Sequence, residues 1–293
     1  MRTSVAIALV AIALAASLGA YVVYQRVAGR ASTAAELLVY APPVVSRYLN
    51  VSIPIFESGH SGVRVQLTYG ATGRLMNQIN LTGTGDVFVV ADSDYMLKAM
   101  RLGMVRNDTV RVISWQVIAI IVPKGNPKNI TSIYDLARPG LKVAIPDPSV
   151  APGGAIAVEI LKAKNIYDKV KDNLVVLPDM AAVAQQVALG AVDAALAWNN
   201  VVYWYPGSLD IVWLNQSDLL YSGCQLAAVL RYSKSPGLAA ELVDFLASYP
   251  RQNRSLALSL GMIVDASTLR ALTPYTSIPG DRVGLCGALG AGG

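Results

Sequence analysis

The sequence has few of the residues that catalysis most often needs. Its 293 residues include one histidine, two cysteines and three phenylalanines, and only 15% of them are charged. The single histidine, His60, lies in a polar Ser-Gly-His-Ser-Gly loop without a serine or cysteine motif beside it, which favours a solvated loop residue. The sequence also lacks a nucleophile elbow, a phosphate-binding loop with its lysine and a cluster of metal-ligating residues. We therefore predict a protein that is not an enzyme and that has no cofactor and no directly bound metal ion.

Basic residues do not cluster either. The net charge is +5, and no run of lysine or arginine alternates with aromatic residues, so we expect no nucleic-acid partner. Apolar residues make up 54% of the chain, which is enough for a large buried core. The length suits two α/β lobes.

The beginning of the chain indicates export. Arg2 precedes an apolar run over residues 5–23, and Arg26 and Arg30 follow it. Such a run is typical of a secretory signal peptide or of an uncleaved membrane anchor, and we assign residues 1–30 to one of these. We expect the protein on the extracellular or periplasmic face, either secreted or held to the cell membrane through residues 5–23.

Two further features agree with export. Cys224 and Cys286 can form a disulfide in an oxidising compartment, although two unpaired thiols agree with the sequence equally well. Sequons for asparagine glycosylation begin at Asn50, Asn80, Asn107, Asn129, Asn215 and Asn253.

The stretch from Val63 to Ile79 carries the clearest functional signal. Its first half alternates apolar and polar residues, as a half-buried strand does, and its second half has apolar residues at helical spacing. Between them lies the small-residue turn Gly70-Ala71-Thr72-Gly73. Unpaired N–H groups and the helix dipole favour an anion at such a helix start, and the Thr72 hydroxyl would add a donor. The alternative is that Thr72 serves only as the N-cap of the helix.

Strand and helix signals alternate along the rest of the chain, which predicts largely parallel sheets covered by helices. Trp115 to Val122 reads as a long apolar strand that crosses into a second lobe, and residues 224–230 return the chain to the first. We therefore predict an α/β fold of two lobes. Its units are lobe I at residues 36–116 and 226–275, lobe II at residues 117–225, and a flexible glycine- and alanine-rich tail at residues 276–293.

Further strand ends lead into helix starts at Val44, at Gly153-Gly154 and at Met180. Ligands of such sheets lie beyond the carboxyl ends of the strands. If the lobes close on each other, these N–H groups and those at Thr72 would meet in one cleft and hold a small dianion without lysine or arginine. A protonated anion would fit less well, because its O–H would find no acceptor there.

Several short motifs follow one another in a specific order. They are Val63–Ile79 with its turn at Gly70–Gly73, Gly85–Asp92, Ile121–Pro127, Asp135–Gly140, Pro152–Gly154 and Leu189–Ala194. In their order and spacing, from roughly Leu37 to Met262, the chain resembles the extracytoplasmic molybdate/tungstate-binding proteins of ABC transporters, which usually have Gly-Ala-Ser-Gly at the first motif. The resemblance implies a two-lobed, type II periplasmic-binding-protein fold with two crossover strands and a ligand cleft between the lobes.

The resemblance also implies a set of oxyanion contacts. Thr72 matches a serine hydroxyl of the family, and Gly153 and Met180 match positions whose backbone N–H groups touch the anion. Further contacts would come from Ser46, Gly73 and Gly154.

Four positions depart from some family members. Val44 falls where a hydroxyl residue is common, so it would offer only its backbone N–H. Trp198 falls where many members have a tyrosine that closes over the anion, and it would either donate its indole N–H or serve only in packing. Ala151 and Ala197 match positions where some archaeal members supply carboxylates, so the resemblance implies plain tetrahedral binding.

The resemblance implies a monomeric solute-binding component of an ABC importer. It would capture molybdate or tungstate and pass it to the permease, which works with a cytoplasmic ATPase. Binding would shift an open–closed equilibrium, with Trp115–Ile118 and Ser222–Gln225 as candidate hinge strands. One alternative is the same fold with sulfate, phosphate or another small anion as ligand. Another is an anchored anion-sensor ectodomain or an enzyme on the same scaffold.

Overall fold

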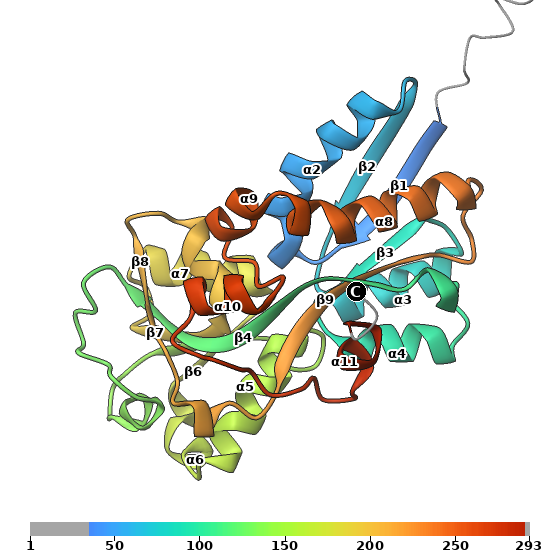
Figure 1. Cartoon of the computed structure of the whole chain (residues 1–293). Coiled ribbons are helices and arrows are strands. Elements are labelled where there is room, and N and C mark those ends of the chain that lie inside the picture. Colours follow the sequence, from blue (N-terminus) through green and yellow to red (C-terminus); the bar gives the residue numbers. More distant parts are fainter. Residues whose placement is uncertain (1–34, 291–293) are drawn as a thin grey trace, which may run out of the picture.

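The computed structural model of the protein describes residues 35–290, which form two α/β lobes (Figure 1). The predicted leader at residues 1–30 therefore lies outside the described residues, together with its apolar run. Among residues 35–290, no helix has both the length and the apolar character that a membrane crossing requires.

Lobe I is built on a sheet in the strand order β2-β1-β3-β9-β4. β1 is parallel to both of its neighbours, β2 and β3, whereas β9 runs antiparallel to β3 and β4. All residues of β3 are buried, as expected of a strand that is covered on both faces. The strands are β1 (Ala35–Ala41), β2 (Val63–Tyr69), β3 (Val87–Val90), β9 (Ser222–Val229) and the first half of β4 (Arg111–Pro123). The helices between them are α2 (Ser46–Gly59), α3 (Thr72–Thr82) and α4 (Ser93–Arg101), and β9 is followed by α8 (Pro236–Gln252), α9 (Arg254–Ser259) and α10 (Ala266–Leu272).

Lobe II continues from the second half of β4. There β4 pairs with β7 and β8, and β5 lies in parallel between β6 and β7. The strands are β5 (Val143–Pro146), β6 (Leu174–Leu177), β7 (Ala194–Trp198) and β8 (Leu209–Val212), and the helices are α5 (Pro152–Ala163), α6 (Tyr167–Val170) and α7 (Met180–Ala188).

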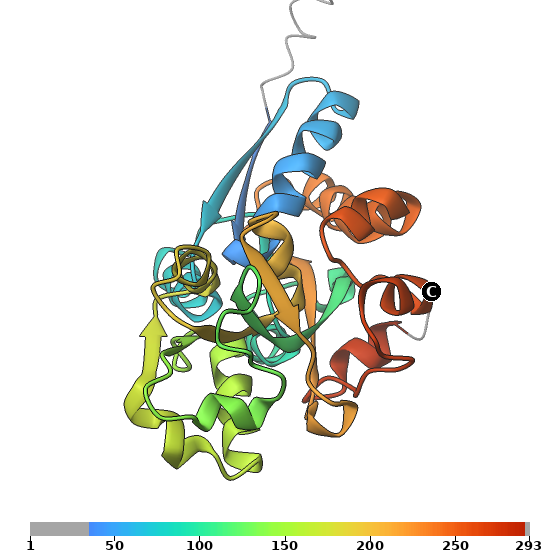
Figure 2. The same cartoon turned by 90° about the vertical axis from the view of Figure 1, so that its left-hand side faces the viewer.

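Short 3₁₀ helices occur in both lobes. They are η1 (Pro43–Val45), η2 (Asn107–Thr109), η3 (Ile133–Ala137), η4 (Lys171–Asn173), η5 (Asn199–Trp204) and η6 (Gln216–Asp218). Figure 2 shows the blue segments of lobe I above the yellow-green segments of lobe II.

Two strands connect the lobes. β4 changes partners between Val117 and Ile118. Val117 pairs with Ser222 of β9 in lobe I, and Ile118 pairs with Trp198 of β7 in lobe II. The chain returns from β8 to lobe I through β9. The predicted two-lobed α/β fold with two crossings is confirmed, and the partner change falls inside the first candidate hinge strand.

A buried chain of polar side chains ties these two strands together. Ser114 Oγ donates to Gln225 Oε1 at 3.0 Å, and Gln225 Nε2 donates to Gln116 Oε1 at 2.9 Å. Gln116 Nε2 in turn donates to the carbonyl oxygen of Ala91 at 2.7 Å, at the end of β3. Because each of these buried groups has a partner, the two connecting strands are held in a fixed position relative to lobe I.

The C-terminal segment differs from the sequence-based prediction. Residues 276–293 were expected to form a flexible tail, but the structure gives an ordered path up to residue 290, with α11 at Leu285–Gly290 packed near α4 and β4. Cys286 forms a disulfide with Cys224 of β9, with a Cα–Cα distance of 6.4 Å. This covalent bond holds the segment to the core, which its glycine-rich composition does not reveal.

The same segment also bridges the lobes. One guanidinium nitrogen of Arg282 lies 3.2 Å from Asp94 of lobe I, and the other lies 2.8 Å from Glu159 of lobe II. The side chains are partly exposed, so this pairing is expected to stabilise the closed arrangement only modestly.

The disulfide is expected to contribute substantially to stability. It joins residues 62 positions apart, for which the chain-entropy model gives about 4 kcal/mol. We predict that replacing Cys224 and Cys286 with serine lowers the thermal unfolding midpoint, and that a reductant lowers the midpoint of the unmodified protein but not that of the double variant. An unchanged midpoint in the double variant would contradict this prediction.

Candidate functional site

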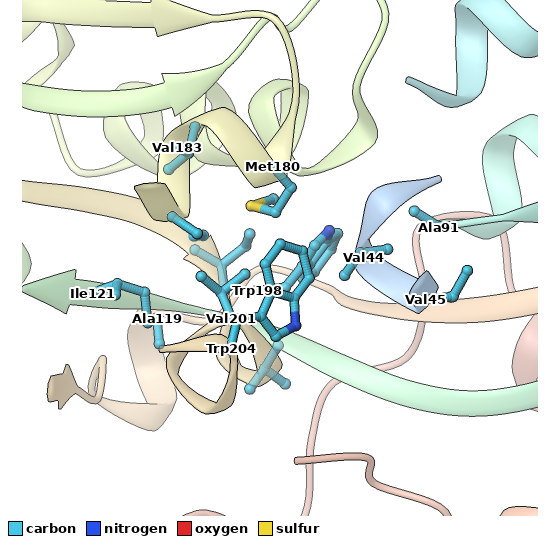
Figure 3. Packing of buried hydrophobic residues seen from close by; sticks show 14 of the residues in the cluster. Val44, Val45, Ala91, Ala119, Ile121, Met180, Val183, Trp198, Val201 and Trp204 are labelled. Carbon is cyan, nitrogen blue, oxygen red and sulfur yellow. The ribbon is translucent and has the colours of Figure 1, made fainter. Parts of the chain in front are cut away.

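A small cavity lies between the lobes, beyond the carboxyl ends of the strands. Its volume is about 20 Å³. The lining residues are Pro42, Pro43, Val44, Ala71, Thr72 and Ala91 from lobe I and Ala151, Pro152, Gly153, Asp179, Met180 and Trp198 from lobe II. The five residues proposed from the sequence as main contacts are thus brought together around one cavity. Figure 3 shows three of them, Val44, Met180 and Trp198, gathered in one cluster.

Four helix starts supply backbone donors to this cavity. They belong to η1, α3, α5 and α7, at Val44, Thr72, Gly153 and Met180. Within residues 35–290, the N–H groups of these four residues have no hydrogen-bond acceptor. The first N–H groups of a helix lack partners inside the helix and carry its partial positive charge, so these four are available to an anion.

The Thr72 side chain offers a fifth donor. Thr72 is 1% exposed, and its Oγ1 atom has no hydrogen-bond partner in the described part of the chain. The N-cap of α3 is Ala71, without a side-chain hydrogen bond, so the alternative that Thr72 caps this helix is wrong. A buried hydroxyl without a partner costs about 1–3 kcal/mol, which a bound ligand would recover.

Trp198 ends β7 and is 1% exposed. Its indole Nε1 lies beside Gly153 and makes no hydrogen bond to residues 35–290. The two alternatives that the sequence left open, packing and an available N–H donor, are therefore compatible in the structure.

The cavity has no cationic side chain in its lining. Its one charged residue is Asp179, whose Oδ1 accepts hydrogen bonds from the N–H groups of Ala181 at 2.9 Å and Ala182 at 3.0 Å and so caps α7. Ala151 lines the cavity without offering a carboxylate, and Ala197 is buried within β7. Across the described residues, no group of three or more histidine, cysteine, aspartate or glutamate side chains could hold a metal ion.

The three further contacts considered from the sequence are not part of the lining. Ser46 is partly exposed at the start of α2. The N–H of Gly73 donates instead to the carbonyl oxygen of Val150 at 3.0 Å, across the lobes. The N–H of Gly154 also donates to a backbone carbonyl, and a Cβ at this position would lie 2.1 Å from the Pro146 oxygen, so its glycine serves the packing of α5 on β5.

Asn200 is a residue of the site region that the sequence analysis missed. It is 4% exposed, and its Nδ2 donates to the carbonyl oxygen of Val44 at 3.3 Å across the lobes. Together with the Gly73–Val150 bond, and with Arg74 Nη2 donating to the Pro178 oxygen at 3.3 Å, it holds the lobes closed. A polar asparagine pair directly after the buried end of β7 was the signal available in the sequence.

A second, larger hollow of about 240 Å³ adjoins the cavity at Pro152 and contains an unusual carboxyl group. Asp92 is 1% exposed; its Oδ1 caps α4 by accepting from the N–H of Asp94 at 3.1 Å, and its Oδ2 has no partner in the described part of the chain. Burial, helped by the nearby charges of Asp94 and Asp281, raises the pKa of Asp92 to about 7.

Comparison with known proteins gives a consistent group of relatives. The family model described as bacterial extracellular solute-binding protein matches residues 37–254. The molybdate-binding protein ModA of Mycobacterium tuberculosis is 28% identical over 217 residues, which are 74% of this chain and 80% of ModA. YvgL of Bacillus subtilis is 31% identical over 146 residues, and this match spans about half of each protein, 50% of this chain and 55% of YvgL.

Solved structures agree on the fold. The sulfate-binding protein SubI of Mycobacterium tuberculosis has a TM-score of 0.70 and 19% identity, over 84% of this chain and 92% of SubI. The periplasmic molybdate-binding protein of Azotobacter vinelandii has a TM-score of 0.67 and 17% identity, over 78% of this chain and 99% of that protein. The predicted periplasmic-binding-protein fold is thereby confirmed.

The buried carboxyl group predicts a specific pH dependence. Because the folded pKa of Asp92 lies above the ordinary value of 3.8, the folded state keeps a proton that the unfolded state has lost between about pH 4 and pH 7, and the free energy of unfolding falls as pH rises through this window. Asp92→Asn keeps the cap and cannot ionise. We expect it to unfold at a higher temperature than the unmodified protein at pH 8, with a gain of up to about 4 kcal/mol that shrinks towards pH 4.

The matched control for this measurement is Asp108→Asn, since Asp108 is exposed in η2. This variant should show no gain that depends on pH. An Asp92→Asn gain that is equal at pH 4 and pH 8 would contradict the assignment.

Proposed function

Because the chain belongs to the bacterial extracellular solute-binding protein family, we propose that it captures molybdate or tungstate outside the cell and delivers the anion to the permease of an ABC importer. As a solute-binding component of an ABC transporter, the protein is not an enzyme and its working partner is a permease. We assign the predicted leader at residues 1–30 to its export or anchoring.

The observation that carries this proposal is the set of unpartnered donors around the cavity. Four backbone N–H groups and the Thr72 hydroxyl have no acceptor within residues 35–290, and no lysine, arginine or histidine belongs to the lining. A fully deprotonated tetrahedral anion offers hydrogen-bond acceptors in several directions. It carries no O–H group, so it needs no acceptor from the protein. Such a donor set therefore favours a dianion over a protonated anion.

The small cavity supports a compact ligand. At about 20 Å³ it leaves no space for a larger organic anion while the lobes are closed. Positions 151 and 197 are alanine and so supply no carboxylate, and the Oδ1 atom of Asp179 in the lining is engaged in capping α7. The metal of the oxyanion would therefore keep its own four oxygens. The ModA relatives support molybdate in particular.

A second candidate ligand is sulfate. It is a tetrahedral dianion as well, and the sulfate-binding protein SubI shares the fold with a TM-score of 0.70. Molybdate and sulfate have the same shape and charge, so the site would have to distinguish them by size.

In mechanistic terms, the anion would stabilise the closed lobes. Its oxygens would join Val44 and Thr72 of lobe I to Gly153 and Met180 of lobe II, in addition to the direct bond between Gly73 and the Val150 carbonyl. A ligand that contacts both lobes favours the closed form by its differential affinity, and the permease would recognise this form.

Thermal unfolding with added anions tests the proposal. A ligand that binds only the folded state adds about 2.7 kcal/mol at a hundredfold excess over its dissociation constant. We expect molybdate and tungstate to raise the unfolding midpoint and phosphate to leave it unchanged. If sulfate alone raised the midpoint, the ligand would be sulfate and not molybdate. If none of these anions raised the midpoint, the proposal would be contradicted.

Changing Thr72 tests the assigned pocket. Thr72→Ala removes a hydrogen bond to a charged ligand, worth about 1.5–3 kcal/mol, so we expect molybdate affinity in calorimetry to fall roughly 10- to 100-fold. Thr72→Ser keeps the hydroxyl and should bind almost as well as the unmodified protein. The control is Thr276→Ala, which changes an exposed threonine away from the cavity. An affinity that Thr72→Ala leaves unchanged would contradict the pocket assignment.

A further inference from the structure

The indole of Trp198 is held between two glycines that belong to different parts of the site. On one side lies Gly153 at the start of α5, where an added Cβ would stand 2.9 Å from the indole Nε1 and 2.8 Å from Cε of Met180. On the other side lies Gly223 of β9, where an added Cβ would stand 2.5 Å from Cη2 and 2.9 Å from Cζ3 of the indole. The ring therefore fills the space between the ligand cavity and the hinge.

The backbone conformation at position 223 does not require a glycine. Its φ is outside the left-handed region, so other residues could adopt the same conformation. It lies within a regular strand, paired with Gln116 of β4. A glycine inside a strand weakens that strand and often marks a close approach by another group. Here the approaching group is the six-membered ring of Trp198.

A side chain at position 223 could not be accommodated by a small adjustment. Trp198 is 1% exposed, and its opposite edge already meets Gly153, so close packing leaves the ring little room to move. Displacement of the ring would push it towards Met180 and into the cavity of about 20 Å³. Both the free volume and the direction of the indole N–H would change as a result.

We propose that Gly223 is a positioning residue for ligand selection. By leaving room for Trp198, this glycine of the hinge strand sets the size of the cavity and aims the indole N–H at a compact tetrahedral dianion. This inference rests on the proposed function of the site and assigns one of its determinants to a residue outside the lining.

A double-mutant cycle tests the inference, with molybdate as the probe and calorimetry as the measurement. Gly223→Ala overpacks the site and is expected to lower affinity at least about tenfold. Trp198→Phe removes the ring atoms that the new methyl group would meet. The affinity of this variant is the reference for the double variant. In the Trp198→Phe background, adding Gly223→Ala should change affinity by less than about twofold.

Gly237→Ala is the matched control, because Gly237 is exposed in α8 with open space around its Cβ position and an ordinary φ. It should bind molybdate as the unmodified protein does. Equal losses from Gly223→Ala in both backgrounds would overturn the inference, since the glycine would then act on the hinge without Trp198. So would unchanged affinity in the Gly223→Ala variant.

A second readout does not depend on ligand. The chain has four tryptophans, and loss of one indole N–H resonance in Trp198→Phe assigns the Trp198 signal in an NMR spectrum. Gly223→Ala should shift this signal and leave the others in place, whereas an unshifted signal would overturn the inference. If the unmodified protein binds none of the oxyanions, the proposed function fails while this measurement still decides the seating of the ring.

Folding of the variants is itself informative. Should Gly223→Ala fail to fold while the double variant with Trp198→Phe folds, the steric conflict with the indole is demonstrated and the inference is supported. Should neither fold, the strand needs glycine for another reason and the inference is overturned.

Discussion

Helix starts without hydrogen-bond partners are the constraint on which the site depends. Every helix leaves its first N–H groups unpaired, and in a largely parallel sheet the helices begin at the edge where the strands end. In both lobes the helices that follow parallel strands begin at one cavity: Val44 and Thr72 follow β1 and β2 of lobe I, and Gly153 and Met180 follow β5 and β6 of lobe II. The fold itself thus concentrates partial positive charge between the lobes, and a small anion needs no lysine or arginine to be held there.

The two connecting strands and the cavity are parts of one packed structure. Gln116 and Gln225 link the two connecting strands through side-chain hydrogen bonds, and Gln116 also holds the carbonyl of Ala91, which lines the cavity. Trp198 continues the connection by lying against Gly223 of β9. The connecting strands and the lining of the cavity are therefore joined by direct contacts.

Much of this arrangement could be predicted from the sequence. Alternating strand and helix signals located the helix starts at Val44, Thr72, Gly153 and Met180, because the carboxyl ends of parallel strands share one edge. The crossing at β4 was visible as a long apolar run. These features follow from local periodicity and therefore need no knowledge of distant contacts.

Features that depend on distant pairs were not predictable. The C-terminal segment is held to the core by the bond between Cys286 and Cys224, which the sequence offered only as one of two alternatives because it does not fix the distance between the two residues. The bond of Gly73 to the Val150 carbonyl and the burial of Asp92 likewise arise only when the two lobes meet. For Gly223, the sequence shows a glycine in an apolar strand and nothing of the indole that requires it.

The most direct test of this account is a crystal structure of the protein grown with tungstate, with anomalous diffraction used to locate tungsten. We expect one strong peak in the cavity between the lobes, with the oxygens of the anion within hydrogen-bond distance of Thr72 Oγ1 and of the N–H groups of Val44, Gly153 and Met180. A peak elsewhere, or an empty cavity at saturating tungstate, would contradict it.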